Sequence, residues 1–164
     1  MTMVNTREVK QVLKENGINT KKIGVRCLSA GYEQVIRVTL KDIYLPLKKI
    51  EAIVKDKFEH VYYEERTMEI LAGGNTFVQI EYDYDIYQEA LDTKMEEAEA
   101  KLKELENQPD NYGYELASKD NLVMYGNKET DQIIITDKTD RSKRSWYNIS
   151  QYDMARALLA LETA

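Results

Sequence analysis

The chain has 164 residues, 43% of them hydrophobic and 32% charged, and its formal net charge at pH 7 is -6. An apolar fraction of this size supports a packed core and argues against a chain that is disordered throughout. The acidic balance disfavours a general nucleic-acid binder, because such proteins are more often basic.

The expected compartment is the reducing cytoplasm. Cys27 is the only cysteine, so no intramolecular disulfide can form within the chain. The first residues lack the charged and apolar regions of a signal peptide, and no apolar run approaches the roughly 20 residues that span a bilayer. We therefore predict a cytoplasmic protein that does not enter a membrane.

The N-terminal pattern predicts a short amphipathic helix followed by a β-hairpin. Asn5 and Glu8 have the spacing of a capping box, and Gly17 is a typical residue at a helix end. Apolar residues then alternate over 23–27 and again over 36–40, with turn-forming residues between the two runs. This alternation predicts two antiparallel strands joined by a somewhat long turn.

A second helix and two more strands are predicted before the middle of the chain. Pro46 fits the first turn of that helix, which carries apolar residues at helical spacing. Residues 60–63 have the composition of a short strand and residues 76–82 that of a longer one. Gly73-Gly74-Asn75 lies between them and predicts a tight turn with positive φ, because a phosphate-binding loop would need a lysine and a helix start there.

The longest predicted helix runs from Asp85 to about Asn107 and has a thin apolar stripe on a charged surface. Its second half, from Met95 onward, has little to bury, so we expect it to project. A polar, proline-containing stretch follows and is the expected linker. The predicted fold class is α+β. An α-β-β-α-β-β-α domain over 1–107 packs helices on one face of a mostly antiparallel sheet, and a small β-rich domain over 108–164 is closed by a helix.

Two segments resemble a known protein family. Residues 64–78 read EERTMEILAGGNTFV, and residues 81–85 read EYDYD. Together they resemble the signature of the large polyvalent protein-associated domains of bacteriophages and conjugative elements, and the resemblance covers roughly residues 5–107. It implies a mobile-element context and no catalytic residues. Stand-alone versions with a new C-terminal unit are the kind of protein that serves as an anti-defence factor, including inhibitors of CRISPR nucleases.

The acidic residues are concentrated in the middle of the chain. Residues 62–106 carry 13 acidic and 4 basic side chains, and carboxylates alternate with tyrosines in two parts of this segment. Tyrosines supply large contact areas at modest entropic cost, and spaced carboxylates imitate the charge of a nucleic-acid backbone. We predict an acidic, tyrosine-rich surface that fits a basic groove, although solvated faces of a helix and an edge strand have the same composition. The candidate binding residues are Tyr63, Glu64, Glu65, Glu69, Asp83, Tyr84, Asp85 and Tyr87.

This surface and the resemblance together favour a mobile-element accessory protein that acts by protein–protein binding. The expected partner is a host defence protein. A CRISPR effector is the favoured target, which makes the chain an anti-CRISPR inhibitor of an RNA-guided nuclease. The chain is not expected to be an enzyme, and no cofactor or metal is expected.

A basic loop at residues 138–144 supports an alternative function as a nucleic-acid-binding regulator. Arg141, Lys143 and Arg144 would contact phosphates. The ring of Trp146, which follows the loop, would stack on bases. The competing interpretation is a solvated hairpin loop, diluted by aspartates, after which Trp146 anchors the small core.

Asp83 and Asp85 support a second alternative, an enzyme with a carboxylate–metal site. Residues two positions apart on a strand point to the same side, so the two carboxylates would share a face. His60 is the only histidine, and one cysteine with one histidine excludes a zinc site within one chain. Neither a lysine nor a further acid at a fixed relation supports this alternative.

Overall fold

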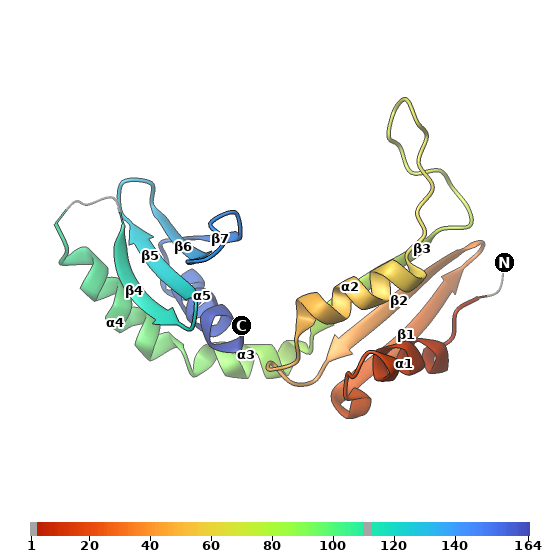
Figure 1. The fold of residues 1–164 in the computed structure, drawn as a ribbon, viewed down its shortest axis with the longest axis horizontal. Helices are drawn as coiled ribbons and strands as arrows, with labels where there is room; N and C mark the ends of the chain where they lie inside the picture. Colours follow the sequence, from red (N-terminus) through yellow and green to blue (C-terminus); the bar gives the residue numbers. More distant parts are fainter. Residues whose placement is uncertain (1–2, 110–112) are drawn as a thin grey trace. The chain divides into compact units, whose positions relative to one another are not determined.

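The computed structural model describes residues 3–109 and 113–164. Its helices and sheets form an α+β protein that divides into two compact units, residues 1–86 (unit 1) and residues 87–164 (unit 2) (Figure 1). The division falls earlier than the predicted linker, because the helix over residues 95–106 packs with the last helix and with the strand over residues 114–119. The predicted boundary after residue 107 is thus replaced by one within a helix.

Unit 1 begins with helix α1 (Thr6–Glu15), and its predicted capping box is confirmed. The Asn5 side chain accepts hydrogen bonds from the N–H groups of Arg7 and Glu8. In return, the Glu8 carboxylate accepts a hydrogen bond from the Asn5 N–H at 2.9 Å. This reciprocal pair satisfies N–H groups that the start of a helix leaves without backbone partners.

The predicted β-hairpin is confirmed, with longer strands and a tighter turn. Strands β1 (Ile23–Ala30) and β2 (Glu33–Leu40) pair antiparallel along their full length. Gly31 and Tyr32 form the connection, and Gly31 has a φ of 61°, which costs a glycine little. The turn is therefore shorter than the sequence predicts.

The second helix, α2 (Leu47–Phe58), leads to strand β3 (Thr76–Tyr82), which pairs parallel with β2. Pro46 occupies the N-cap of α2 rather than its first turn. A helical crossover brings the next strand back in the same direction, so this sheet is mixed, with the order β1-β2-β3. The other sheet is antiparallel throughout, and antiparallel pairing therefore predominates in the molecule.

Helices α1 and α2 pack on one face of the three-stranded sheet. Their apolar side chains meet alternate residues of the strands, as a two-layer unit requires. The opposite face carries the exposed cross-strand pair Arg26 and Arg37. The buried core of unit 1 includes Val9, Leu13, Ile36, Val38, Leu40, Ile50, Val54 and Val78.

The strand predicted over residues 60–63 is absent from the described structure. The chain makes isolated bridges at His60 and at Tyr63 instead of a continuous ladder. These residues lie in a long excursion between α2 and β3, residues 59–75, which we call the arm. The arm extends away from the sheet (Figure 1), so it has no neighbouring strand along its length.

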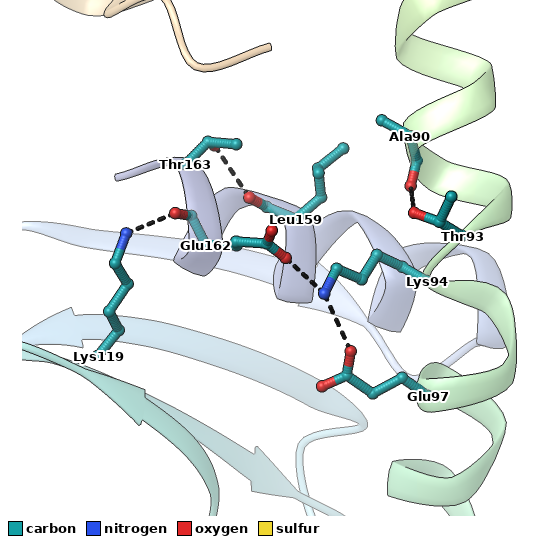
Figure 2. Close-up of polar contacts among 8 residues, drawn as sticks. All are labelled: Ala90, Thr93, Lys94, Glu97, Lys119, Leu159, Glu162 and Thr163. Atoms are coloured by element: carbon teal, nitrogen blue, oxygen red, sulfur yellow. Dashed lines mark hydrogen bonds and ion pairs between the residues drawn. The ribbon is translucent and has the colours of Figure 1, made fainter.

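The prediction of a single long helix in the middle of the chain is wrong. Two helices, α3 (Tyr84–Asp92) and α4 (Met95–Glu106), flank a turn at Thr93 and Lys94. The Thr93 hydroxyl donates a hydrogen bond to a carbonyl of the preceding turn at 2.7 Å (Figure 2). The Lys94 N–H bonds to the carbonyl three residues back, at 2.8 Å, instead of four. This tighter turn breaks the helical period.

Helix α4 does not project, contrary to the prediction. It packs against the C-terminal helix α5 (Gln151–Thr163), and it buries Ala98 and Leu105. Lys94 forms an ion pair with Glu162 of α5 (Figure 2). That carboxylate is the main cause that raises the pKa of Lys94. The apolar stripe of α4 is thin because a small side chain such as Ala98 fills the space where α4 and α5 approach closely.

Unit 2 is completed by a four-stranded antiparallel meander in the order β4-β5-β6-β7. Helix α5 packs against all four strands, and Ser150 caps it as predicted by accepting the N–H of Asp153 at 3.1 Å. Among the helices of the described residues, none is long and apolar enough to cross a membrane. The strands are β4 (Tyr114–Lys119), β5 (Leu122–Asn127), β6 (Gln132–Asp137) and β7 (Arg144–Asn148).

Gly126 tests the packing of α4 on this sheet. A Cβ atom there would lie 2.7 Å from the side chain of buried Leu105 and 3.0 Å from that of Leu116. We expect Gly126→Ala to lower the free energy of unfolding of unit 2 by about 1–3 kcal/mol through overpacking, as measured by urea denaturation. Gly24→Ala is the matched control, because its Cβ would meet the nearest atoms at an ordinary 3.7 Å. Equal stabilities of the two variants would contradict this packing.

Candidate functional site

The base of the arm is held by one buried amide. Asn75 is 0% exposed, and its Nδ2 donates hydrogen bonds to the Glu33 carboxylate at 3.0 Å and to the Leu71 carbonyl at 2.7 Å. Its Oδ1 accepts the N–H of Tyr62 at 2.8 Å. The amide thus joins both sides of the arm to the β1–β2 hairpin, because Glu33 is the first residue of β2.

The glycines beside Asn75 close the same base. Gly73 and Gly74 have φ values of 95° and 80°, so the predicted tight turn with positive φ is confirmed. The N–H of Gly73 donates to the Glu33 carboxylate at 3.3 Å, and the N–H of Gly74 donates to the Tyr32 carbonyl at 2.9 Å. Hydrogen bonds from Asn75 and Gly73 lower the pKa of Glu33.

The far part of the arm is folded by Glu64. Its carboxylate accepts the N–H groups of Arg66 at 3.0 Å and Thr67 at 2.6 Å, and its backbone bonds to Met68 and Glu69. The bonds from Thr67 are the main reason that the pKa of Glu64 is lowered. Glu64 was predicted to contact a partner, but its carboxylate is engaged in this turn.

The arm exposes apolar side chains that a soluble domain would ordinarily bury. Met68 is 68% exposed and Ile70 is 53% exposed. Tyr32, in the hairpin turn at the arm's base, is 85% exposed. Exposed apolar groups gathered on one projection mark a surface for macromolecular contact. We call this set the arm surface: Tyr32, Tyr62, Tyr63, Met68, Ile70 and Leu71.

Glu65 and Glu69 supply negative charge beside this surface, and the exposed Arg66 supplies a positive charge between them. Both residues are exposed, and within the part of the chain that the structure describes neither carboxylate has a hydrogen bond or an ion pair. Tyr63 lies next to them, with its backbone in the bridge to Ile70. Three of the predicted binding residues, Tyr63, Glu65 and Glu69, therefore stand on the arm with their side chains available.

The other predicted binding residues lie at the opposite end of β3. The arm ends where β3 begins, and Asp83 follows its last residue. Seven residues at the rise of a β-strand separate the two groups by about 20 Å. The eight predicted residues thus fall into two groups, one on the arm and one at the start of α3.

The second group also has structural roles. Asp83 precedes α3, and its Oδ1 accepts the N–H of Ile86 at 3.4 Å, the position of an N-cap. Asp85 lies in the first turn of α3, where a carboxylate interacts favourably with the helix dipole. Burial acts to lower the pKa of the Arg156 guanidinium, but hydrogen bonds with Tyr87 and Asp153 outweigh this effect and raise it. Tyr84 remains 74% exposed.

The positions of Asp83 and Asp85 remove the basis for the carboxylate–metal alternative. Asp83 and Asp85 sit at a helix start and not on a strand, so their two-residue spacing does not direct them to one side. In residues 3–109 and 113–164, no group of three or more histidine, cysteine, aspartate or glutamate side chains is placed to hold a metal ion. His60 stacks on Tyr62, with ring centroids 6.1 Å apart.

Trp146 of unit 2 is 58% exposed, so the interpretation in which it anchors the core is wrong. Arg141, Lys143 and Arg144 are exposed as well. The Nε of Arg144 donates to the Arg141 carbonyl at 2.7 Å, and Lys143 lies 3.5 Å from the Asp140 carboxylate. The basic loop and Trp146 therefore belong to a second candidate surface.

Sequence reasoning missed the apolar members of the arm surface. Met68, Ile70 and Leu71 show neither strand alternation nor helical spacing, and Tyr32 lies in a turn. One signal could have pointed to these residues: the short apolar run before Gly73-Gly74 fits neither a strand nor a helix of the predicted fold. Exposure of these residues depends on the arm leaving the sheet, which no local pattern encodes.

Comparison of the chain with protein-family models, with curated proteins and with solved structures found no match.

Asn75 provides a test of the arm's base. We expect Asn75→Ala to lower the free energy of local opening of the arm by about 1–3 kcal/mol, because buried partners lose their hydrogen bonds. Hydrogen exchange at the Tyr62 and Gly73 amides measures this opening, and exchange in unit 2 should stay unchanged. Asn16→Ala is the control, since Asn16 is exposed at the end of α1. Unchanged exchange at Tyr62 would contradict the role of Asn75.

The lowered pKa values of Glu33 and Glu64 predict that acid loosens the arm. A carboxyl whose pKa is depressed in the folded arm stabilises it fully above the ordinary glutamate pKa of about 4.3 and loses that effect as the pH falls through the folded value. Amide shifts of Gly73 and Thr67, followed by NMR from pH 7 to pH 2.5, should move together below about pH 4. In Glu33→Gln the transition at Gly73 should disappear, and its persistence would refute this assignment.

Proposed function

We propose that this protein acts by binding another protein through the arm surface. The supporting observation is a projection whose base is tied by a buried amide and whose far part exposes Met68 and Ile70. Pre-ordering of a contact surface lowers the entropy lost on binding. Aromatic and long apolar side chains are the usual anchors of protein interfaces.

The acids of the arm define the kind of partner. Glu65 and Glu69 flank the apolar side chains and outweigh the single exposed cation Arg66, so the surface fits an apolar depression with a mainly basic rim. Charges at a rim chiefly increase the association rate and select the partner, while the apolar centre supplies most of the affinity. This differs from imitation of a nucleic-acid backbone, for which the acids would have to be continuous.

We propose a host defence protein as the partner, with an RNA-guided CRISPR nuclease as the favoured target. The support is the resemblance of residues 64–78 to domains of bacteriophages and conjugative elements, because this segment builds most of the arm. Nucleases of this kind hold their nucleic acids in basic channels, which have the charge that Glu65 and Glu69 would meet. In this proposal the chain is a cytoplasmic inhibitor and not an enzyme.

The double variant Tyr63→Ala/Ile70→Ala tests the arm surface. We expect it to weaken binding to the purified effector at least about 30-fold, since anchors at an interface centre contribute about 2 kcal/mol or more. Binding is measured by biolayer interferometry on the effector, and inhibition by DNA cleavage with excess protein. Both side chains are about half exposed, so the fold should survive, as circular dichroism would verify.

Tyr84→Ala is the matched control, because Tyr84 is 74% exposed and lies at the far end of β3. It should bind like the unchanged protein. Lys substitutions of Glu65 and Glu69 should slow association and make it less sensitive to salt. Binding that survives the Tyr63/Ile70 change would exclude the arm surface, and full cleavage by a panel of RNA-guided nucleases would exclude that target class.

A further inference from the structure

We propose that the sheet face of unit 2 that carries Trp146 binds single-stranded nucleic acid. One face of this sheet is covered by helices, because Leu105 of α4 contacts Gly126 and Arg156 of α5 lies over the Tyr147 ring. Gly126 and Tyr147 share one cross-strand row through Ile133. The neighbouring row therefore points to the opposite side.

That neighbouring row is apolar and partly exposed. Tyr125, Ile134 and Trp146 lie side by side on β5, β6 and β7. Trp146 is 58% exposed, and the other two are partly buried. A flat row of aromatic and aliphatic groups across three strands offers a platform on which bases stack, and such stacking is tolerant of sequence.

Cationic and amide side chains flank the platform on the same face. Along β7, Arg144 and Asn148 stand two residues to either side of Trp146, at steps of about 7 Å. Asn148 pairs with Gln132 across the sheet, so amides lie at one end and guanidinium at the other. In this arrangement Arg144 would contact a phosphate and the ring of Trp146 would stack on a base. The amides of Gln132 and Asn148 would hydrogen-bond to the edge of a base.

The acids near the cations are engaged in turns. Asp137 accepts the N–H of Thr139 at 2.8 Å and its hydroxyl at 2.6 Å. The Asp140 carboxylate accepts hydrogen bonds from the N–H of Ser142 at 3.2 Å and from the Ser142 hydroxyl at 2.6 Å. It also forms an exposed ion pair with Lys143. Lys138, Arg141 and Arg144 are exposed, and among the described residues no carboxylate forms an ion pair with them.

A pocket of about 140 Å³ lies at the edge strand β7, where it is bordered by Trp146 and Asn148 of the exposed face and by Tyr147 of the helix-covered face. A planar base that stacks on Trp146 there would meet the amides of Gln132 and Asn148 at its edge. On the helix-covered side of the pocket, Arg156 donates a hydrogen bond to Asp153 at 2.9 Å. The lining residues are Gln132, Trp146, Tyr147, Asn148, Asp153 and Arg156.

The charge pattern favours a single strand over a protein or a duplex. The acids of unit 2 are dense on α4, which lies on the helix-covered face, whereas the loop beside Trp146 is basic. A duplex hides the base faces that Trp146 would contact. This inference concerns unit 2 and does not depend on the arm.

Trp146 is itself the reporter for the test, because it is the only tryptophan in the chain. Fluorescein-labelled dT20 and rU20 are titrated with the whole protein at about 50 mM salt. The expected result is a rise in anisotropy that runs parallel to quenching of tryptophan fluorescence, with weaker binding to a duplex of the same length. An absent anisotropy change, or binding without quenching, would overturn the proposal.

Variants separate the stacking and the phosphate contacts. Trp146→Ala should weaken dT20 binding by about fivefold to a hundredfold, while Trp146→Phe should retain most of the affinity. Arg141→Ala/Arg144→Ala should reduce the slope of log K against log salt by about 1.4, the value for two phosphate contacts on a single strand. This double variant and the quenching of the unchanged protein give an answer even if Trp146→Ala fails to fold.

Lys14→Ala and Lys48→Ala are the matched controls, since both side chains are exposed and lie in unit 1. Neither should change the affinity for dT20 or the salt slope. Equal losses in these controls, or an unchanged affinity of Trp146→Ala, would overturn the assignment of the site to this face.

Discussion

The buried side chain of Asn75 is the interaction on which the arm depends. One amide carries both donors and an acceptor, so it bonds simultaneously to Glu33 on the sheet and to Tyr62 and Leu71 on the two sides of the arm. An aspartate would lack the donors, and a leucine would leave backbone groups unpaired in a buried place.

Several carboxylates that the sequence suggests as parts of a charged surface form local hydrogen bonds that stabilise the fold. Glu33 closes the arm, Glu64 folds its far part, and Asp83 caps α3. In each case the carboxylate accepts a backbone N–H that would otherwise lack a partner. What remains for a partner on the arm is an apolar centre with Glu65 and Glu69 at its side, and this favours recognition by shape and burial over recognition by charge alone.

The two units present surfaces of different chemistry. The arm surface of unit 1 is apolar with acidic neighbours, while the partly exposed sheet face of unit 2 combines Trp146 with cations and amides. The first suits a protein and the second suits a nucleic-acid strand. The two proposals are independent, because they rest on different residues in different units.

The sequence by itself determined the elements whose signals lie within a few residues: the capping box at Asn5, the hairpin, β3 and the cap of α5 at Ser150. It also marked Tyr63, Glu65 and Glu69 as available side chains. Only the tertiary structure decided the parallel pairing of β3, the break at Thr93, the exposure of Trp146 and the separation of the two tyrosine-rich segments by the length of a strand. The reason is physical: capping and strand alternation are interactions between near neighbours in the chain, whereas burial, sheet pairing and the distance between segments depend on residues that meet only after folding.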